Sequence, residues 1–424
     1  MLRLRPRPKP WDEQCVPDWV AEDLGPAGYA PLVPSEDLTD AKERADTVDL
    51  FAGPGGLDVA ARWLGREVYG LEWDIDACRT RKAAGLNFER HDVRDLGPEN
   101  FPAATMLMGG PPCQTFTVAG NGAGRRALDT VLKFIIAMAA GESVQEELAQ
   151  LEDERTGLVL EPLRWALRAA ELGRPYRTIV LEQVPAVLPV WEAMAEVLRD
   201  KLQYRVQTKV LHTEMYGVPQ TRRRAVLIAS IDGTRPMPQP THQIYRKAGL
   251  RPTDNHRLPK WKTMADALPD RRETFRVISN YGTGGDPKLR GVRKSDQPSA
   301  TVTGKISRNK VVTNGQTDRF KDAEAGRLQS FPLDYPWQEG AVAQQIGNAV
   351  PPIFGLHVLS AALGCQVTRE QADKIFELEW ADVQCKKPEK LPAVVAELHE
   401  RIRSGAGNAA ALRDDGVDEY VMDQ

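Results

Sequence analysis

One cysteine, Cys113, stands where a strand-end turn could hold a reactive thiol. The apolar run Ala104–Met108 predicts a buried strand, and the segment Gly109–Asn121, GGPPCQTFTVAGN, follows it directly. Its glycines allow a tight turn and its prolines stiffen the backbone, so the thiol would lie at a strand's carboxyl end, where α/β sheets bind ligands. Cys113 is therefore a candidate nucleophile beneath a closing loop, and a buried structural cysteine is the alternative.

A carboxyl group follows a second predicted strand. The apolar segment Thr178–Leu181 predicts a strand, and Glu182 follows it among apolar neighbours. An apolar environment favours the neutral form of a carboxyl group, so Glu182 is a candidate proton donor at neutral pH. Pairing with a nearby arginine is the alternative.

Two arginines precede a third predicted strand. In the segment QTRRR, Arg222 and Arg224 come just before the strand Ala225–Ala229, and their spacing of two residues predicts that they point to the same side. Arginines in such a place bind phosphate or carbonyl oxygens. A solvated basic edge is the alternative.

The first predicted strand leads into a glycine-rich turn. Thr47–Phe51 is followed by AGPGGLD and by an amphipathic helix, Val59–Leu64, so backbone N–H groups and a helix N-terminus could meet a ligand there. Asp58 stands where a dinucleotide fingerprint has its third glycine, so the signal for NAD is weak.

Acidic residues also end the next two predicted strands. Glu67–Leu71 runs into Glu72 and Trp73, and Phe88–His91 runs into Asp92. Such carboxylates can accept hydrogen bonds from ribose hydroxyls or an exocyclic amine, and an indole can stack on a purine. The pattern predicts a nucleoside pocket without an evident phosphate site. Solvated turns or helix caps are the alternative for each acid alone.

Composition excludes several classes of protein. A chain of 424 residues with 42% hydrophobic and 27% charged residues is typical of a globular protein with a full core. No apolar run reaches the roughly 18 residues of a membrane span, and the basic N-terminus lacks the apolar core of a signal peptide. The 5 cysteines form no Cys-x-x-Cys pair, which favours a reducing cytoplasm and no metal site.

Charge is unevenly distributed. Residues 245–310 hold 16 Lys and Arg against 6 Asp and Glu, a net charge of +10. Residues 366–424 hold 8 against 13, a net charge of −5. The basic segment predicts a polyanion-binding surface, with a well-solvated loop region as the alternative.

Taken in order, seven short blocks resemble the DNA (cytosine-5)-methyltransferases. They cover residues 47–230 and about 319–364. The blocks are DLFAGPGG, GLEWD, GGPPCQ, LEQV, QTRRR, RLQSFP and QIGNAVP.

The resemblance implies an α/β fold, the S-adenosylmethionine-dependent methyltransferase fold, with a mostly parallel, doubly wound sheet and a smaller target-recognition domain. The expected organisation is an N-terminal arm (1–46), a catalytic domain (47–240) completed by residues 319–365, a target-recognition domain (241–318) and an acidic C-terminal tail (366–424). One or two short helices are expected after residue 365.

The resemblance also implies roles for individual residues. Cys113 would be the nucleophile, Glu182 would contact N3 and the amino group of cytosine, and Arg224 would bind its O2. Gln220 and Arg222 would support the loop and the flipped base. The S-adenosylmethionine pocket would comprise Phe51, Ala52, Gly53, Gly55, Gly56, Glu72, Trp73, Asp92, Pro111 and Asn348.

The implied function is methylation of cytosine C5 in a specific duplex DNA sequence, in a bacterial or phage modification system. The protein would act as a cytoplasmic, nucleoid-associated monomer on DNA, alongside a possible cognate endonuclease. The alternatives are a tRNA cytosine-5 methyltransferase and a non-enzymatic DNA-binding regulator. Gln183 departs from the family's usual Asn. A helix is expected over 128–151, but the segment 120–152 and the tail have no assigned role.

Overall fold

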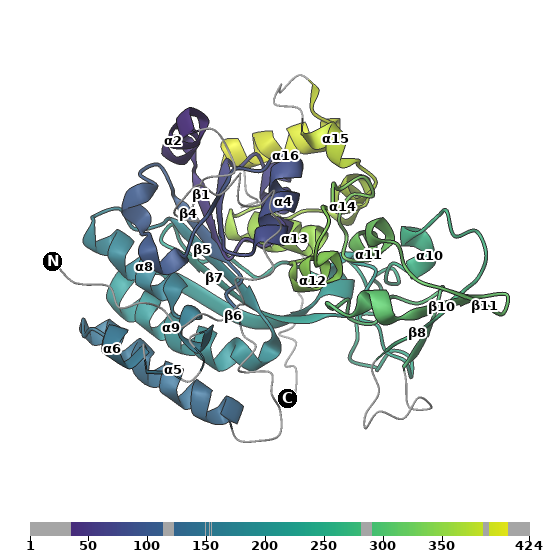
Figure 1. The fold of residues 1–424 in the computed structure, drawn as a ribbon, viewed down its shortest axis with the longest axis horizontal. Coiled ribbons are helices and arrows are strands. Elements are labelled where there is room, and N and C mark those ends of the chain that lie inside the picture. The colour runs from purple at the N-terminus through teal and green to yellow at the C-terminus, as the bar shows by residue number, and fades with distance from the viewer. Residues whose placement is uncertain are drawn as a thin grey trace, which may run out of the picture.

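A computed structural model describes residues 35–112, 123–148, 150, 151, 153, 155–280, 291–384 and 390–405. Within these ranges a larger α/β unit is joined to a smaller β unit (Figure 1). The helices are α2 Ser35–Arg44, α3 Gly56–Trp63, α4 Ile75–Ala83, α5 Ala123–Ala140, α6 Gln145–Leu148, α7 Arg155–Leu158, α8 Glu161–Glu171, α9 Leu188–Leu202, α10 Met264–Ala267, α11 Asp322–Leu328, α12 Val342–Asn348, α13 Pro352–Ala362, α14 Arg369–Phe376, α15 Trp380–Val383 and α16 Ala393–Arg403.

The larger unit is built on a seven-stranded sheet with the order β3-β2-β1-β4-β5-β7-β6. Strand β7 runs antiparallel to both of its neighbours and the other pairs are parallel, which confirms the predicted fold class. The strands are β1 Thr47–Leu50, β2 Val68–Glu72, β3 Phe88–Arg90, β4 Met106–Gly109, β5 Thr178–Gln183, β6 Arg205–His212 and β7 Arg223–Ser230.

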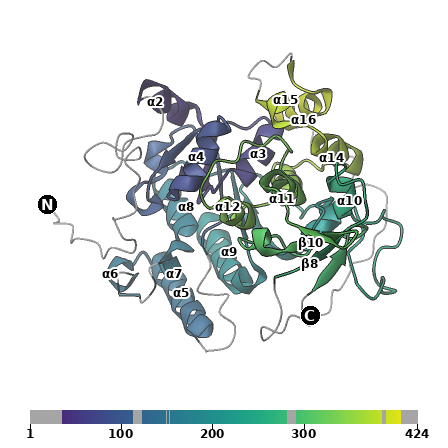
Figure 2. The same ribbon diagram turned by 45° about the vertical axis from the view of Figure 1, so that its right-hand side comes forward.

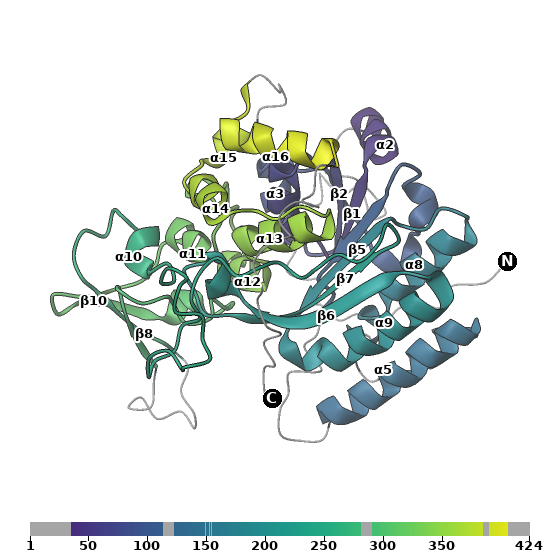
Figure 3. The same ribbon diagram turned by 180° about the vertical axis from the view of Figure 1, so that it is seen from behind.

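Both faces of this sheet are buried. Met106, Met108 and Val180 pack with α3 and α13 on one face, whereas Leu107 and Ile179 pack with α8 and α9 on the other. Strands covered on both sides need continuous apolar runs, and this is why β4 and β5 could be recognised in the sequence. Helix α5 packs on α9 and forms an outer layer, which Figure 3 shows from behind.

The smaller unit contains a four-stranded antiparallel sheet with the order β11-β10-β8-β9, which lies beside α10 and α11 in Figure 2. Its apolar side chains, such as Val277 and Val311, belong to the same core cluster as α13. The two units therefore share one core. The strands are β8 Arg276–Ile278, β9 Val292–Lys294, β10 Lys310–Thr313 and β11 Gln316–Asp318.

The structure differs from the sequence-based expectation in three places. The expected N-terminal arm includes helix α2. The helix expected over 128–151 ends at Ala140, because Gly141 adopts φ +82°, a left-handed conformation that ends helices. Among the described residues beyond 365, three helices form rather than one or two, and α14 and α16 pack on α13 and α3. None of the helices in the described ranges is long and apolar enough to cross a lipid bilayer.

Two buried histidines are expected to make the folded protein less stable in mild acid. Burial lowers the pKa of His242 from its ordinary 6.5 to about 4, and that of His357 to about 3. As pH falls from 6.5 the unfolded chain therefore gains protons that the folded protein does not, so unfolding becomes easier. Each histidine is expected to cost about 2 kcal/mol of stability at pH 5 relative to pH 7.

Urea unfolding at pH 7 and pH 5 measures this effect. His242→Asn is expected to reduce the stability difference between the two pH values. His256→Asn, at an exposed histidine, serves as the matched control. An unchanged difference in His242→Asn would show that His242 does not contribute.

Candidate active site

The glycine-rich turn after β1 is shaped by close packing. Gly55 has φ +104°, and a Cβ there would lie 2.3 Å from Leu86 Cδ1. A Cβ on Gly56 would lie 2.1 Å from the carbonyl oxygen of Val350. Phe51 also has a positive φ of 60°. Residue 55 favours glycine because of its positive φ and the nearby Leu86 side chain. Residue 56 must be glycine because the segment that carries Val350 closes directly over the turn.

Glu72 fastens this turn to the end of β2. Its Oε2 accepts a hydrogen bond from Gly53 N at 2.7 Å, and its Oε1 accepts from the backbone N–H groups of Trp73 and Asp74, each at 2.7 Å. Burial raises the pKa of Glu72, while these three N–H groups lower it. Because a carboxylate offers about four acceptor positions, about one remains for a ligand. The neighbouring Trp73 side chain is exposed, with Arg90 over its ring.

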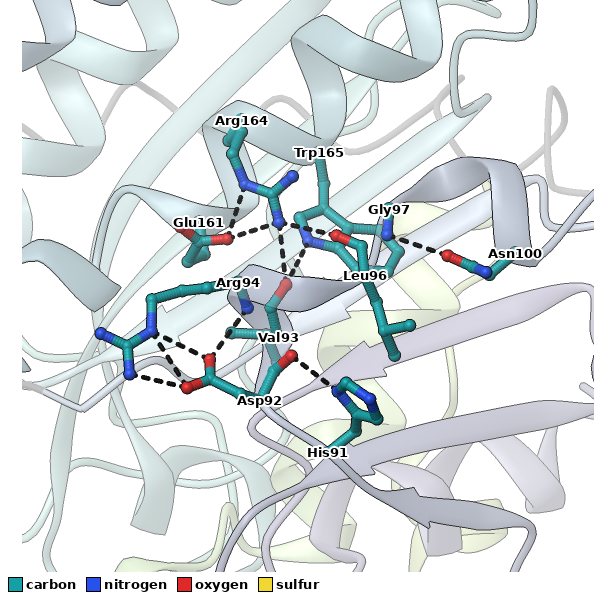
Figure 4. A network of polar contacts seen from close by, with 10 residues as sticks. All are labelled: His91, Asp92, Val93, Arg94, Leu96, Gly97, Asn100, Glu161, Arg164 and Trp165. Atoms are coloured by element: carbon teal, nitrogen blue, oxygen red, sulfur yellow. Dashed lines mark hydrogen bonds and ion pairs between the residues drawn. The ribbon is translucent and has the colours of Figure 1, made fainter. Parts of the chain in front are cut away.

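Asp92 follows β3 as predicted, but it has an arginine partner that the sequence analysis missed. Arg94 Nη2 lies 2.6 Å from Asp92 Oδ2, and Arg94 N donates to Asp92 Oδ1 at 3.0 Å (Figure 4). Both contacts tighten the short turn that begins at Asp92. The sequence DVRD could have indicated this contact, because an Asp at a helix N-cap commonly accepts a hydrogen bond from the backbone two residues later.

Helix α8 supports the same turn from outside. Arg164 Nη2 donates to the carbonyl oxygens of Val93 and Leu96, both at 2.8 Å, and Glu161 Oε2 holds this guanidinium at 2.7 Å (Figure 4). A single ion-paired arginine thus fixes two carbonyl groups of the turn.

Glu182 and Arg224 form an ion pair at the carboxyl end of β5. Arg224 Nε lies 2.7 Å from Glu182 Oε1, and both side chains are about nine-tenths buried. Strands β5 and β7 pair Glu182 with Val226, which brings the start of β7 beside the end of β5. The structure therefore contains the arginine pairing that the sequence analysis considered as an alternative for Glu182.

The segment that leads to Cys113 lies against Glu182. A Cβ on Gly110 would lie 3.8 Å from Glu182 Oε2. Gln183 Nε2 donates to the carbonyl oxygen of Pro111 at 2.6 Å, so this longer amide ties the end of β5 to the residues after β4. Cys113 itself lies outside the described residues.

Gln220 and Arg222 join separate parts of the chain. Gln220 Nε2 donates to Leu328 O at 3.0 Å, and Val302 N donates to Gln220 Oε1 at 2.9 Å. Arg222 donates to the carbonyls of Val302, Gly347 and Ala349 at 2.9, 3.1 and 3.3 Å.

Arg222 and Arg224 therefore contact different groups. Strand β7 begins only at Arg223, so the alternation of a strand does not extend to Arg222. Nearby, Asn348 ends α12 on the surface and accepts from Gln344 Nε2 at 2.9 Å.

Beneath the glycine-rich turn lies a buried charge cluster that the sequence analysis also missed. Asp58, noted there only as a missing glycine, pairs with Arg81 at 2.6 Å. Asp49 is buried next to them, and burial together with Asp58 raises its pKa well above its ordinary value. Across the part of the chain that the structure describes, no three His, Cys, Asp or Glu side chains are placed to hold a metal ion.

Comparison with known proteins identifies related sequences and a related fold. A family model described as C-5 cytosine-specific DNA methylase matches residues 45–137 and 177–361. Type II methyltransferase M1.HphI of Haemophilus parahaemolyticus is 28% identical over 354 residues, covering 74% of this chain and 86% of that protein. Type II methyltransferase M.HpaII of Haemophilus parainfluenzae is 25% identical over 360 residues, covering 77% and 91%. The crystal structure of S. pombe Dnmt2 methyltransferase has a TM-score of 0.51 at 17% identity, covering 76% of this chain and 98% of that one, which shows the shared fold.

Proposed function

The chain belongs to the C-5 cytosine-specific DNA methylase family and is a DNA cytosine-5 methyltransferase, and from this premise we propose that it methylates a flipped cytosine through a covalent Cys113 adduct. Its relatives are type II methyltransferases, so we assign it to restriction–modification or to self-protection of a phage. The proposed substrate is a specific duplex DNA sequence, bound by a cytoplasmic, nucleoid-associated monomer. A cognate endonuclease would cut the same sequence.

S-adenosylmethionine is the methyl donor of this enzyme class, and the residues at the first strand ends fit it. Glu72 keeps about one acceptor position for a ribose hydroxyl, and the exposed Trp73 indole can pack on adenine. Asp92 would accept from the adenine amine. When bound, the molecule supplies an electrophilic methyl group on a sulfonium sulfur. The other residues proposed to hold it are Phe51, Ala52, Gly53, Gly55, Gly56, Pro111 and Asn348.

The carboxyl and guanidinium groups are proposed to act on the cytosine ring. Addition of the Cys113 thiolate to C6 places negative charge on the ring and makes C5 nucleophilic. A proton or hydrogen bond from Glu182 at N3 and the Arg224 cation at O2 would stabilise that charge. Once C5 carries the methyl group, a base removes the C5 proton and the thiolate leaves C6. Gln220 and Arg222 would support the loop and the flipped base through their hydrogen bonds to separate segments of the backbone.

Duplex DNA must present the base outside the helix for this chemistry, because stacking blocks access to C6. The basic segment 245–310 is proposed to contact phosphates, with side chains of the domain at 241–318 reading base edges. The catalytic domain would comprise residues 47–240 and 319–365, flanked by the arm (1–46) and the C-terminal segment (366–424).

One observation carries this proposal: Glu182 and Arg224 lie 2.7 Å apart beside the segment that leads to Cys113. N3 and O2 are attached to the same ring carbon, so two groups this close can contact both atoms at once.

Covalent trapping tests the adduct. Duplex DNA in which 5-fluorocytosine replaces cytosine, incubated with S-adenosylmethionine, is expected to form a complex that survives denaturation, because fluorine at C5 cannot leave as a proton does. Cys113→Ser should lose the complex, while Cys365→Ala, at another cysteine, should keep it. No complex on DNA whose unmodified form is methylated would contradict the thiol mechanism.

Gln183 is expected to affect rate more than binding. Gln183→Leu removes the donor to Pro111 O, so the segment before Cys113 loses its tie to β5. We expect kcat to fall about 10- to 100-fold, since small displacements of reacting groups are costly. The Kd for S-adenosylmethionine should change little. Gln207→Leu, on β6, is the control, and an unchanged kcat in Gln183→Leu would show that the tie is dispensable.

A further inference from the structure

The guanidinium of Arg81 contacts several groups beneath the glycine-rich turn. The side chain is fully buried, and it forms two parallel contacts with Asp58, Nη2 to Oδ1 at 2.6 Å and Nη1 to Oδ2 at 2.9 Å. The same Nη1 lies 3.3 Å from Ala52 O and 3.4 Å from Gly53 O. Asp58 thus aims the guanidinium at two successive carbonyl groups of the turn.

The surrounding residues are fitted to this guanidinium. A Cβ on Gly70, in β2, would lie 2.0 Å from Arg81 Nη2, so only glycine leaves room for it. The hydroxyl of Tyr335, also fully buried, donates to the carbonyl oxygen of Pro54, the next one along the turn. The carbonyl groups of residues 52–54 are therefore all held from below by buried donors. On the other side Gly53 N donates to Glu72.

The buried carboxyl groups of this cluster require a cation, and Arg81 supplies it. Asp49 and Asp58 are both buried, and the Arg81 cation lies next to them. Without Arg81, Asp58 would be left as an uncompensated buried charge, which is strongly unfavourable. The Arg81–Asp58 ion pair is therefore a fixed part of the folded structure, unlike an ion pair on the surface.

We propose that Arg81, aimed by Asp58, is a positioning residue that sets the backbone of the turn at 52–56 for S-adenosylmethionine and so determines cofactor affinity. Arg81 does not touch the cofactor in this account. It orients Ala52 and Gly53, and through Gly53 N it fixes the Glu72 carboxylate. The inference rests on the proposed function in one respect, that this turn binds S-adenosylmethionine.

The test separates positioning from simple stability. Arg81→Met leaves Asp58 unpaired and is expected to lower both stability and affinity. The double variant Arg81→Met/Asp58→Leu removes both partners of the buried ion pair, so the melting temperature should largely recover. The Kd for S-adenosylmethionine, measured by calorimetry, should stay raised about 10-fold or more, because the carbonyl groups still lack their donor.

Two further variants keep the test decisive. Arg81→Lys retains the charge but not the two-pronged contact, and it should weaken cofactor binding even if the Met variants do not fold. Arg79→Met, on the same helix and paired with Asp76 at 2.8 Å, is the matched control and should bind normally.

Amide hydrogen exchange of a peptide covering 48–63 gives a readout without ligand. We expect residues 52–56 to exchange faster in the double variant and in Arg81→Lys. We expect no change in Arg79→Met. Recovery of normal affinity and exchange in the double variant would overturn the inference, as would normal values in Arg81→Lys. Failure of the unaltered protein to bind S-adenosylmethionine would instead overturn the proposed function, while the exchange data still test the turn.

Discussion

Replacing Cys113 with serine is expected to reduce methyl transfer to background while leaving S-adenosylmethionine binding intact. A thiol with a pKa of about 8.5 reaches the thiolate form far more easily than a hydroxyl group, and the thiolate is the species that adds to C6. Most of the residues proposed to hold the cofactor follow β1, β2 and β3, so we expect their contacts not to depend on this side chain.

Two assays on the same preparation check this expectation. Incorporation of labelled methyl groups into duplex DNA measures transfer, and calorimetry measures the Kd for S-adenosylmethionine. Cys365→Ala controls for the loss of a thiol. Residual transfer near the unaltered rate would exclude Cys113 as the nucleophile, and a loss of cofactor binding would mean that the thiol belongs to the cofactor pocket.

Glu182→Gln is expected to lower kcat by about 100-fold or more, as is typical when a positioned acid is lost. The variant keeps the size of the side chain, yet it removes the proton that would reach N3 and leaves Arg224 without its ion pair. Single-turnover rates at saturating DNA would report the chemical step directly.

Glu324→Gln is the matched control, because Glu324 pairs with Arg271 at 2.6 Å in another part of the fold. That variant should turn over normally. A near-normal rate in Glu182→Gln would remove Glu182 from the mechanism and leave charge stabilisation to Arg224 alone.

Much of the sheet could be predicted, because its strands are buried on both faces. Continuous apolar runs marked β4 and β5. The acids that follow the predicted strands, Glu72, Asp92 and Glu182, do lie at or near strand ends. Strand boundaries differ by one or two residues, since the runs do not mark where backbone pairing stops. The ion pair of Glu182 was foreseen only as an alternative.

The supports of the site could not be predicted, because they join residues far apart in sequence. Arg81 lies in a helix with no marked apolar periodicity. The residues around it in the sequence do not indicate that its side chain contacts Asp58, 23 residues earlier. Arg222 likewise binds carbonyls about 80 to 127 residues away. Such contacts depend on how helices and segments dock, which a local pattern does not encode.

The most direct test of the central claim is the identity of the product. The purified protein is incubated with S-adenosylmethionine and mixed-sequence duplex DNA, the DNA is digested to nucleosides, and mass and retention time identify any methylated nucleoside. We predict 5-methyldeoxycytidine, lost with Cys113→Ser. A methylated adenine, methylation confined to tRNA offered in parallel, or sequence-specific DNA binding with no methylated nucleoside would contradict the account.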